Sequence, residues 1–124
     1  MLWHYTCAHG FRGIGRRGMI RPNRHPLLPG RPRLIWLTHD DSGPVSRSRL
    51  GLTSNFLSCD RMEYRYSICD EDAILFLDYA RRMRWAESDW ANELLVGDAD
   101  PSLWWVLDHS TLGLLDRSYG KAAA

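Results

Sequence analysis

Apolar residues along this chain fall into short runs that are separated by glycine, proline and polar clusters. Runs rich in aromatic and β-branched residues indicate strands, whereas apolar residues spaced three and four apart indicate an amphipathic helix. The pattern predicts strands at residues 1–6, 34–38, 62–68, 93–96 and 103–107, and helices at residues 9–18 and 70–84. Because its run is continuously apolar, the second strand is expected at the centre of a sheet with both faces covered.

The helix predicted at residues 70–84 has the most complete pattern. Its first three residues are acidic and its last turn contains arginines, which suits the helix dipole at both ends. Its buried stripe follows the helical repeat: Ala73, Phe76, Leu77 and Ala80. Gly18 is placed to end the shorter helix in a left-handed conformation. The turn residues at 97–101 predict that the strands 93–96 and 103–107 form a hairpin.

Three stretches follow neither period. Residues 21–33 contain four prolines and four arginines, which predicts an irregular basic loop. Within residues 45–58 part of the chain is expected to be a short helix, with Leu50 and Leu52 packed inward. Residues 112–115 are expected to form a terminal turn or a sheet edge.

The bulk composition indicates one α+β domain. A chain of 124 residues can form a single core, and 44% hydrophobic with 25% charged residues is ordinary for a globular protein. We expect the domain to span residues 1–121 and interpret residues 122–124 as a cloning scar. No apolar run approaches the roughly 18 residues of a membrane span, and Met1 leads directly into a strand-like run rather than a signal peptide. These features predict a cytoplasmic location.

Charge is unevenly distributed, although the net charge is only +1. Residues 1–69 contain eleven Arg and four Asp or Glu, whereas residues 70–124 contain five basic and eleven acidic residues. One explanation is that a GC-rich genome favours Arg and that the two halves neutralise each other when folded. The other is that the N-terminal half binds a polyanion, such as a dinucleotide pyrophosphate or a nucleic acid. The sequence leaves both open.

The cysteines do not form a recognisable framework. Cys7, Cys59 and Cys69 are an odd and sparse set, which argues against structural disulfides. His4 and His9 lie close to Cys7 in the sequence, which is compatible with a metal site. No C-x-x-C pair and no second cluster supply the remaining ligands. We therefore expect free thiols and no metal.

The first predicted strand places His4 and Thr6 on the same side, because alternate residues of a strand face the same way. A short helix, a glycine and an X-Pro exit follow. This order resembles the opening of ADP-ribosyltransferase-fold proteins, whose first strand carries a His-x-Thr/Ser motif that holds NAD. The resemblance implies an α+β fold of two small antiparallel sheets around a cleft with flanking helices, and it implies NAD as a substrate.

Residues 91–96, Ala-Asn-Glu-Leu-Leu-Val, extend this likeness. They resemble the glutamate-containing strand of DarT-type toxins, which are ADP-ribosyltransferases that modify DNA. The resemblance implies that Glu93 is the catalytic residue, which orients the ribose and stabilises positive charge on an oxocarbenium-like sugar. Glu87 and Asp89 are competing candidates, and Glu93 could also be an ordinary carboxylate at a strand end.

The other expected site residues come from the first and second strands. His4 and Thr6 would hold the ribose and nicotinamide amide of NAD, with Trp36 and Thr38 beside them on the central strand. We expect His4, Trp36 and Glu93 to line one pocket from three strands. The arginines of the loop at residues 21–33, together with Arg47 and Arg49, are expected to border this pocket and to make one rim of it positive. His4 could instead be a hydrogen-bonded histidine of the sheet, and Trp36 a core residue.

Two departures from the family pattern bear on function. The diphtheria-toxin-like branch has a tyrosine on the central strand and another on the next helix, but Trp36 takes the first place and no Tyr lies between residues 38 and 63. A tRNA 2′-phosphotransferase-like enzyme shares the fold and uses NAD, but its catalytic Arg and His residues cannot be placed here.

We expect NAD-dependent ADP-ribosyl transfer or NAD glycohydrolysis, with a nucleic acid or nucleotide as the favoured acceptor. The alternative is a non-catalytic phage or mobile-element effector that binds a host protein or nucleic acid through its Arg-rich half.

Overall fold

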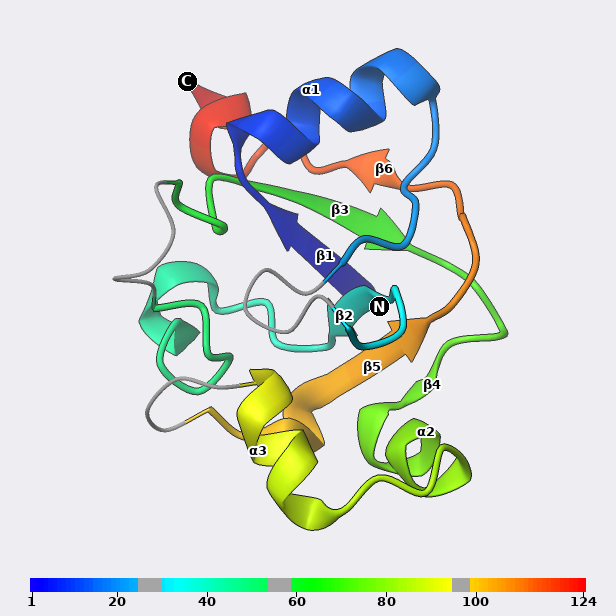
Figure 1. Ribbon diagram of the computed structural model, residues 1–124. Helices are drawn as coiled ribbons and strands as arrows, with labels where there is room; N and C mark the ends of the chain where they lie inside the picture. Colours follow the sequence, from blue (N-terminus) through cyan, green and yellow to red (C-terminus); the bar gives the residue numbers. More distant parts are fainter. Residues whose placement is uncertain (25–29, 54–58, 95–98) are drawn as a thin grey trace.

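The computed structural model describes residues 1–24, 30–53, 59–94 and 99–124, with the backbone alone for residues 91–94. Within these residues, six strands form one antiparallel sheet in the order β4-β5-β2-β1-β3-β6 (Figure 1). The strands are β1 (Leu2–Thr6), β2 (Ile35–Thr38), β3 (Tyr64–Ile68), β4 (Ile74–Leu75), β5 (Trp104–Leu107) and β6 (Leu114–Leu115). The α-helices are α1 (Ala8–Arg17), α2 (Phe76–Arg82) and α3 (Glu87–Leu94), and the 3₁₀ turns are η1 (Gly43–Ser46), η2 (Pro101–Leu103) and η3 (Gly120–Ala123). The protein is a small α+β domain.

Alternate residues of the strands face two hydrophobic cores. On β2, Trp36 packs against one core, while Ile35 and Leu37 belong to the other. The first core includes α2 together with Leu50 and Leu52, and α1 contributes to the second. Figure 1 shows α1 at one end of the molecule and α2 and α3 at the other. Five tryptophans pack in or against the first core: Trp3, Trp36, Trp85, Trp90 and Trp104.

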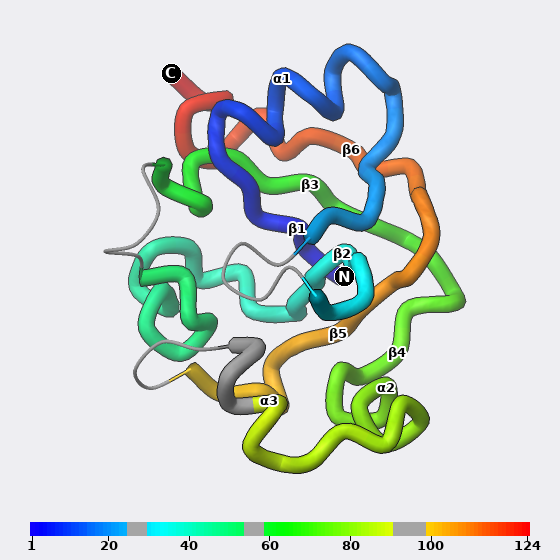
Figure 2. Tube along the Cα trace, viewed as in Figure 1, coloured from blue at the N-terminus to red at the C-terminus, as the bar shows by residue number. Residues whose placement is uncertain are grey.

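Several predicted elements are confirmed. The apolar strand β2 lies inside the sheet between β5 and β1, and β3 follows the predicted alternation with Tyr66 and Ile68 buried. Gly18 ends α1 with φ +74°, and its N–H donates to the Ile14 carbonyl. The tube in Figure 2 shows residues 39–53, which follow β2, as a compact set of turns beside the sheet. Among the described residues no helix is both long and apolar enough to cross a membrane.

The prediction of two separate sheets is wrong, because β1 joins the two halves into one sheet by pairing with both β2 and β3. The helix predicted at residues 70–84 is shorter than expected. Ile74 and Leu75 form strand β4 and pair with β5, so α2 begins only at Phe76. Edge pairing along β5 therefore outweighs the helical pattern in this stretch, while the predicted stripe residues Phe76 and Ala80 remain fully buried.

The strand predicted at residues 93–96 is wrong for its described part. Glu93 and Leu94 lie in the last turn of α3, and residues 95–98 are outside the described residues. The physical reason is local: alanine, glutamate and leucine are strong helix formers, and Glu87 and Asp89 in the first turn favour the positive end of the helix dipole. Strand β5 consequently pairs with β2 and β4 rather than in the predicted hairpin.

The C-terminal segment is fastened to the sheet through Arg65 of β3. Its guanidinium lies 4.1 Å from the Trp3 ring and 4.5 Å from the Tyr119 ring, and its Nε donates to Asp116 Oδ2 at 2.8 Å. The two cation–π contacts and the largely buried ion pair between Arg65 and Asp116 together hold this end of the chain in place. Next to it, Gly120 adopts φ +55°, and a Cβ there would lie 2.2 Å from the Glu63 carbonyl oxygen. Only glycine fits this position.

Candidate functional site

The site begins where β1 and β2 separate. Within the described residues these strands are in register at one pair, Trp3 and Thr38. Beyond it, β1 continues along β3 and β2 continues along β5. Past this point His4 Nδ1 lies 3.1 Å from the Trp36 carbonyl oxygen, so a side chain takes over where the backbone ladder ends. We call this divergence of β1 and β2 the seam.

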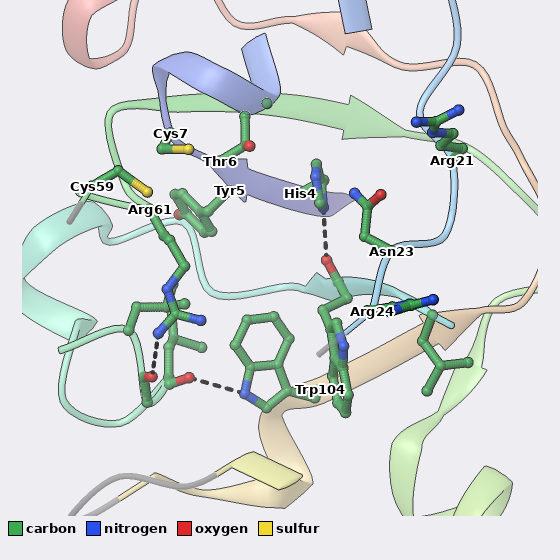
Figure 3. Close-up of a pocket in the computed structure, with 16 residues that line it drawn as sticks. His4, Tyr5, Thr6, Cys7, Arg21, Asn23, Arg24, Cys59, Arg61 and Trp104 are labelled. Carbon is green, nitrogen blue, oxygen red and sulfur yellow. Dashed lines mark hydrogen bonds between the residues drawn. The ribbon is translucent and has the colours of Figure 1, made fainter. Parts of the chain in front are cut away.

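A cavity of about 360 Å³ lies at the seam (Figure 3). This volume is within the range of small-molecule sites, which is roughly 300–1,000 Å³. The wall is mixed in chemistry, with polar, basic and aromatic side chains: His4, Thr6, Asn23, Arg21, Arg24, Arg61, Tyr5, Trp36 and Trp104. The cavity can therefore hold a ligand that has an aromatic or apolar part and an anionic part.

His4 is held as a neutral imidazole with a defined tautomer. Burial lowers its pKa below the ordinary value, and the hydrogen bond to the Trp36 carbonyl only partly opposes this effect. Because a carbonyl can only accept, Nδ1 must carry the proton, and Nε2 is left as an acceptor. The ring therefore offers an acceptor nitrogen to a ligand at neutral pH.

Thr6 is positioned by a close approach to helix α1. A Cβ added to Gly10 would lie 1.9 Å from the Thr6 hydroxyl oxygen, so the absence of a side chain at residue 10 makes room for that hydroxyl. Both residues line the cavity. The predicted His-x-Thr pair thus lies in one cavity, with a glycine from the first turn of α1 beneath the threonine.

Trp36 contributes to the cavity and to the core at once. Its ring lies 4.8 Å from Phe76 and 5.8 Å from Trp104, centroid to centroid. The Trp104 indole nitrogen donates to the Leu50 carbonyl at 3.2 Å, which fixes the second ring. Two aromatic side chains that are held by the core therefore form part of the wall. Trp36 packs against the core, as its alternative interpretation held, and its contact with NAD stays a prediction.

Arg61 is the most unusual residue of the wall. One terminal nitrogen donates to the Gly51 carbonyl at 3.1 Å, but its buried Nε has no hydrogen-bond partner. Burial lowers the pKa of Arg61, and the nearby thiols of Cys59 and Cys7 partly oppose this shift. Arginine nevertheless stays charged in proteins. Among the described residues no carboxylate forms an ion pair with it or lines the cavity, so the positive wall is not neutralised from within.

The remaining predicted residues lie elsewhere. Thr38 is fully buried, its hydroxyl accepts from the Asp40 N–H at 3.1 Å, and it is not part of the cavity wall. Glu93 lies on α3, and its side chain is outside the described structure. From the predicted basic rim, Arg21 and Arg24 do line the cavity.

Two other arginines that were expected at the rim are engaged in ion pairs. Arg47 is paired with Asp60 at 2.6 Å, and Arg49 with Asp40 at 3.1 Å. Neither lines the cavity. The basic character of the cavity therefore comes from a smaller set of arginines than the sequence suggested.

Sequence reasoning missed several residues of the wall, among them Arg61, Asn23 and Cys59. Asn23 pairs through its backbone with Leu34, just before β2, which brings the irregular loop to the seam. Cys59 and Arg61 precede β3, far in sequence from the first strand. The proline-rich composition of the loop was a signal for Asn23, but no local pattern pointed to the other two.

Comparisons with protein-family models, with curated proteins and with solved structures found no match for this chain. The site is therefore interpreted from its own geometry and chemistry.

Proposed function

We propose that the cavity at the seam binds NAD and that the protein transfers or hydrolytically releases its ADP-ribose. The observation that carries the proposal is the partly buried Arg61, whose Nε lacks a partner in a wall where no described carboxylate offsets three arginines. A buried donor and an unneutralised positive wall are both stabilised by an anionic ligand. The pyrophosphate of a dinucleotide has this chemistry.

The rest of the wall suits the two ends of such a ligand. Trp36 and Trp104 offer aromatic surface for a base, and His4 and Thr6 offer hydrogen-bonding groups for a ribose or an amide. This division of roles agrees with the resemblance to ADP-ribosyltransferase-fold proteins that the His-x-Thr order carries. By that resemblance the fold would be a variant in which strand β1 joins the two expected sheets into one.

Chemistry at the nicotinamide–ribose bond requires one further group. Departure of nicotinamide leaves positive charge on the sugar, and a nearby carboxylate lowers the barrier by stabilising that charge. Glu93 remains the proposed carboxylate, now carried by helix α3 instead of a strand. The acceptor of the ADP-ribose would be a nucleic acid or a nucleotide, since the N-terminal half of the chain is rich in arginine.

A second candidate is a binding protein without catalysis. The absence of a carboxylate from the described part of the cavity wall favours it. Cleavage of NAD needs a carboxylate beside the sugar, whereas binding of an anion does not. In this case the ligand would be a nucleotide, or a nucleic acid or host protein that presents an anionic group. The two candidates share the cavity and differ in whether NAD is broken.

The test is nicotinamide release from NAD, followed for the parent protein, Glu93→Gln and Glu87→Gln. We expect Glu93→Gln to reduce the rate by about 10²–10³, as is typical when one preorganised electrostatic contact is lost. Its NAD affinity should change far less, since the contact acts mainly in the transition state. Glu87→Gln lies on the same helix and should behave like the parent.

NAD affinity is measured separately by thermal shift. An active parent with equal rates for both variants would remove Glu93 from its role. Binding of NAD without nicotinamide release would support the binding protein, and no binding at low salt would contradict both candidates.

A further inference from the structure

A second cluster of reactive side chains lies beside the cavity, at the junction of β1 and α1. Cys7 is the N-cap residue of α1, His9 is in its first turn, and Cys59 comes from the segment before β3. One ligand atom from each lies within 4.8 Å of the other two, and Cys7 Sγ is 3.8 Å from His9 Nδ1. Cys7 and Cys59 also line the cavity, and Figure 3 shows them side by side.

These distances are close to the edges of a tetrahedral zinc site. With Zn–S bonds of about 2.3 Å and Zn–N bonds of about 2.1 Å, the S–N and S–S edges of a tetrahedron are about 3.6 and 3.8 Å. Each distance between two ligand atoms would need to shorten by no more than about 1.2 Å to match these edges. We propose that Cys7, His9 and Cys59 form a binding site for a zinc ion, with the fourth coordination position open.

The donor set is selective for this class of metal. Thiolate and imidazole ligands suit zinc, whereas magnesium and calcium prefer oxygen. Two sulfur ligands and one nitrogen with an open fourth position is a combination known from catalytic zinc sites. The exposed His9 and the partly exposed Cys59 leave a route by which an ion can enter.

Positive charge surrounds the two cysteines, although burial raises the pKa of the Cys59 thiol, so a bound metal must displace the proton of that thiol. The N-terminus of a helix carries partial positive charge, and Cys7 occupies that end of α1 without a side-chain capping bond. Arg61 interacts electrostatically with both cysteines. A divalent ion with two thiolates has no net charge, so the ion does not force the guanidinium away.

The sequence did not reveal this site because its ligands are divided between two distant segments. Cys7 and His9 are near neighbours, but Cys59 meets them only when the segment before β3 folds against the start of α1. A bound ion would link these segments and fix one wall of the cavity. The proposal does not depend on NAD chemistry, since its readout is metal binding.

The experiment is titration of the chelator-treated protein with Co²⁺ in a thiol-free reductant, followed by visible absorption. We expect the intense bands of tetrahedral Co²⁺ at one ion per chain, and their loss when Zn²⁺ is added in competition. Cys7→Ser, His9→Gln and Cys59→Ser should each weaken binding by more than about 100-fold, beyond the 10–100-fold that loss of an outer-shell partner causes. Cys69→Ser is the matched control, because Cys69 is exposed and lies just after β3.

Far-UV circular dichroism of every variant shows that it is folded, and Cys59→Ser is the decisive one because Cys59 is only partly buried. The weak spectrum of octahedral Co²⁺ in the parent would overturn the proposal. Equal Co²⁺ affinity of Cys59→Ser and Cys69→Ser would overturn it as well.

Discussion

Replacing Gly10 with alanine should separate the stability of the fold from the integrity of the cavity. The new Cβ would lie 1.9 Å from Thr6 Oγ1, whereas ordinary contacts begin at 3.4 Å. The hydroxyl would have to move by about 1.5 Å, which requires a change of the threonine rotamer. Gly10→Ala therefore removes the Thr6 hydroxyl from its place in the cavity wall without altering residue 6 itself.

Two opposing effects of Gly10→Ala on the free energy of unfolding nearly cancel. Alanine in place of glycine favours a helix by up to about 1 kcal/mol, while a displaced side chain costs about 0.5–1.5 kcal/mol. The free energy of unfolding of Gly10→Ala should therefore stay within about 0.5 kcal/mol of the parent value. Loss of one hydrogen bond to the ligand is worth about 0.5–1.5 kcal/mol, which corresponds to roughly 2- to 12-fold weaker NAD binding.

Gly15→Ala is the matched control, since it lies on the same helix and nothing lies within 4 Å of its added Cβ. This variant should be stabilised by about 1 kcal/mol with unchanged ligand affinity. Urea unfolding and calorimetric NAD titration of the three proteins give both quantities. If Gly10→Ala were stabilised as much as Gly15→Ala and bound NAD like the parent, the close approach and the role of Thr6 would both be refuted.

Two further predictions concern the fold. Gly120→Ala should destabilise the protein by more than the roughly 1–2 kcal/mol that a left-handed conformation costs an ordinary residue, because the added Cβ would also lie 2.2 Å from the Glu63 carbonyl oxygen. Urea unfolding gives the loss, with Gly30→Ala as the control because its added Cβ has open space. Equal stability of the two variants would contradict this prediction. The hydrogen bond between His109 and Asp70 raises the pKa of His109 above 6.5, so its stabilisation is complete below pH 6.5 and is lost as the pH rises through the raised value. Between pH 6 and pH 9 the melting temperature of the parent should thus fall further than that of His109→Gln. An equal fall in both proteins would show that the His109–Asp70 hydrogen bond does not stabilise the fold.

Local patterns in the sequence were sufficient for the elements that depend on local physics. The apolar run of β2, the alternation of β3 and the glycine end of α1 each reflect a repeat or a single residue with one favoured conformation. The pair His4 and Thr6 followed from the period of a strand, and both lie in the cavity as expected. These predictions needed no information about distant contacts.

The errors arose where pairing between distant segments decides the structure. Ile74 and Leu75 fit the apolar pattern of the predicted helix, yet they pair with the edge of β5 and form a strand. Glu93 occupies a short run that fits a helix or a strand, and the acidic first turn of α3 is a stronger determinant than the apolar residues after it. Arg61 and Cys59 could not be placed, because no short-range rule brings the segment before β3 against the end of β1.

The seam explains why the fold and the candidate site cannot be separated. If β1 and β2 paired along their whole length, backbone hydrogen bonds would fill the space that the cavity occupies. Past the one registered pair of these strands, His4 Nδ1 donates to the Trp36 carbonyl, so a side chain links β1 and β2 where their backbone pairing ends. This bond also leaves Nε2 free to accept. The side chain that links the two strands at this point is therefore the same one that the proposed function places against the ligand.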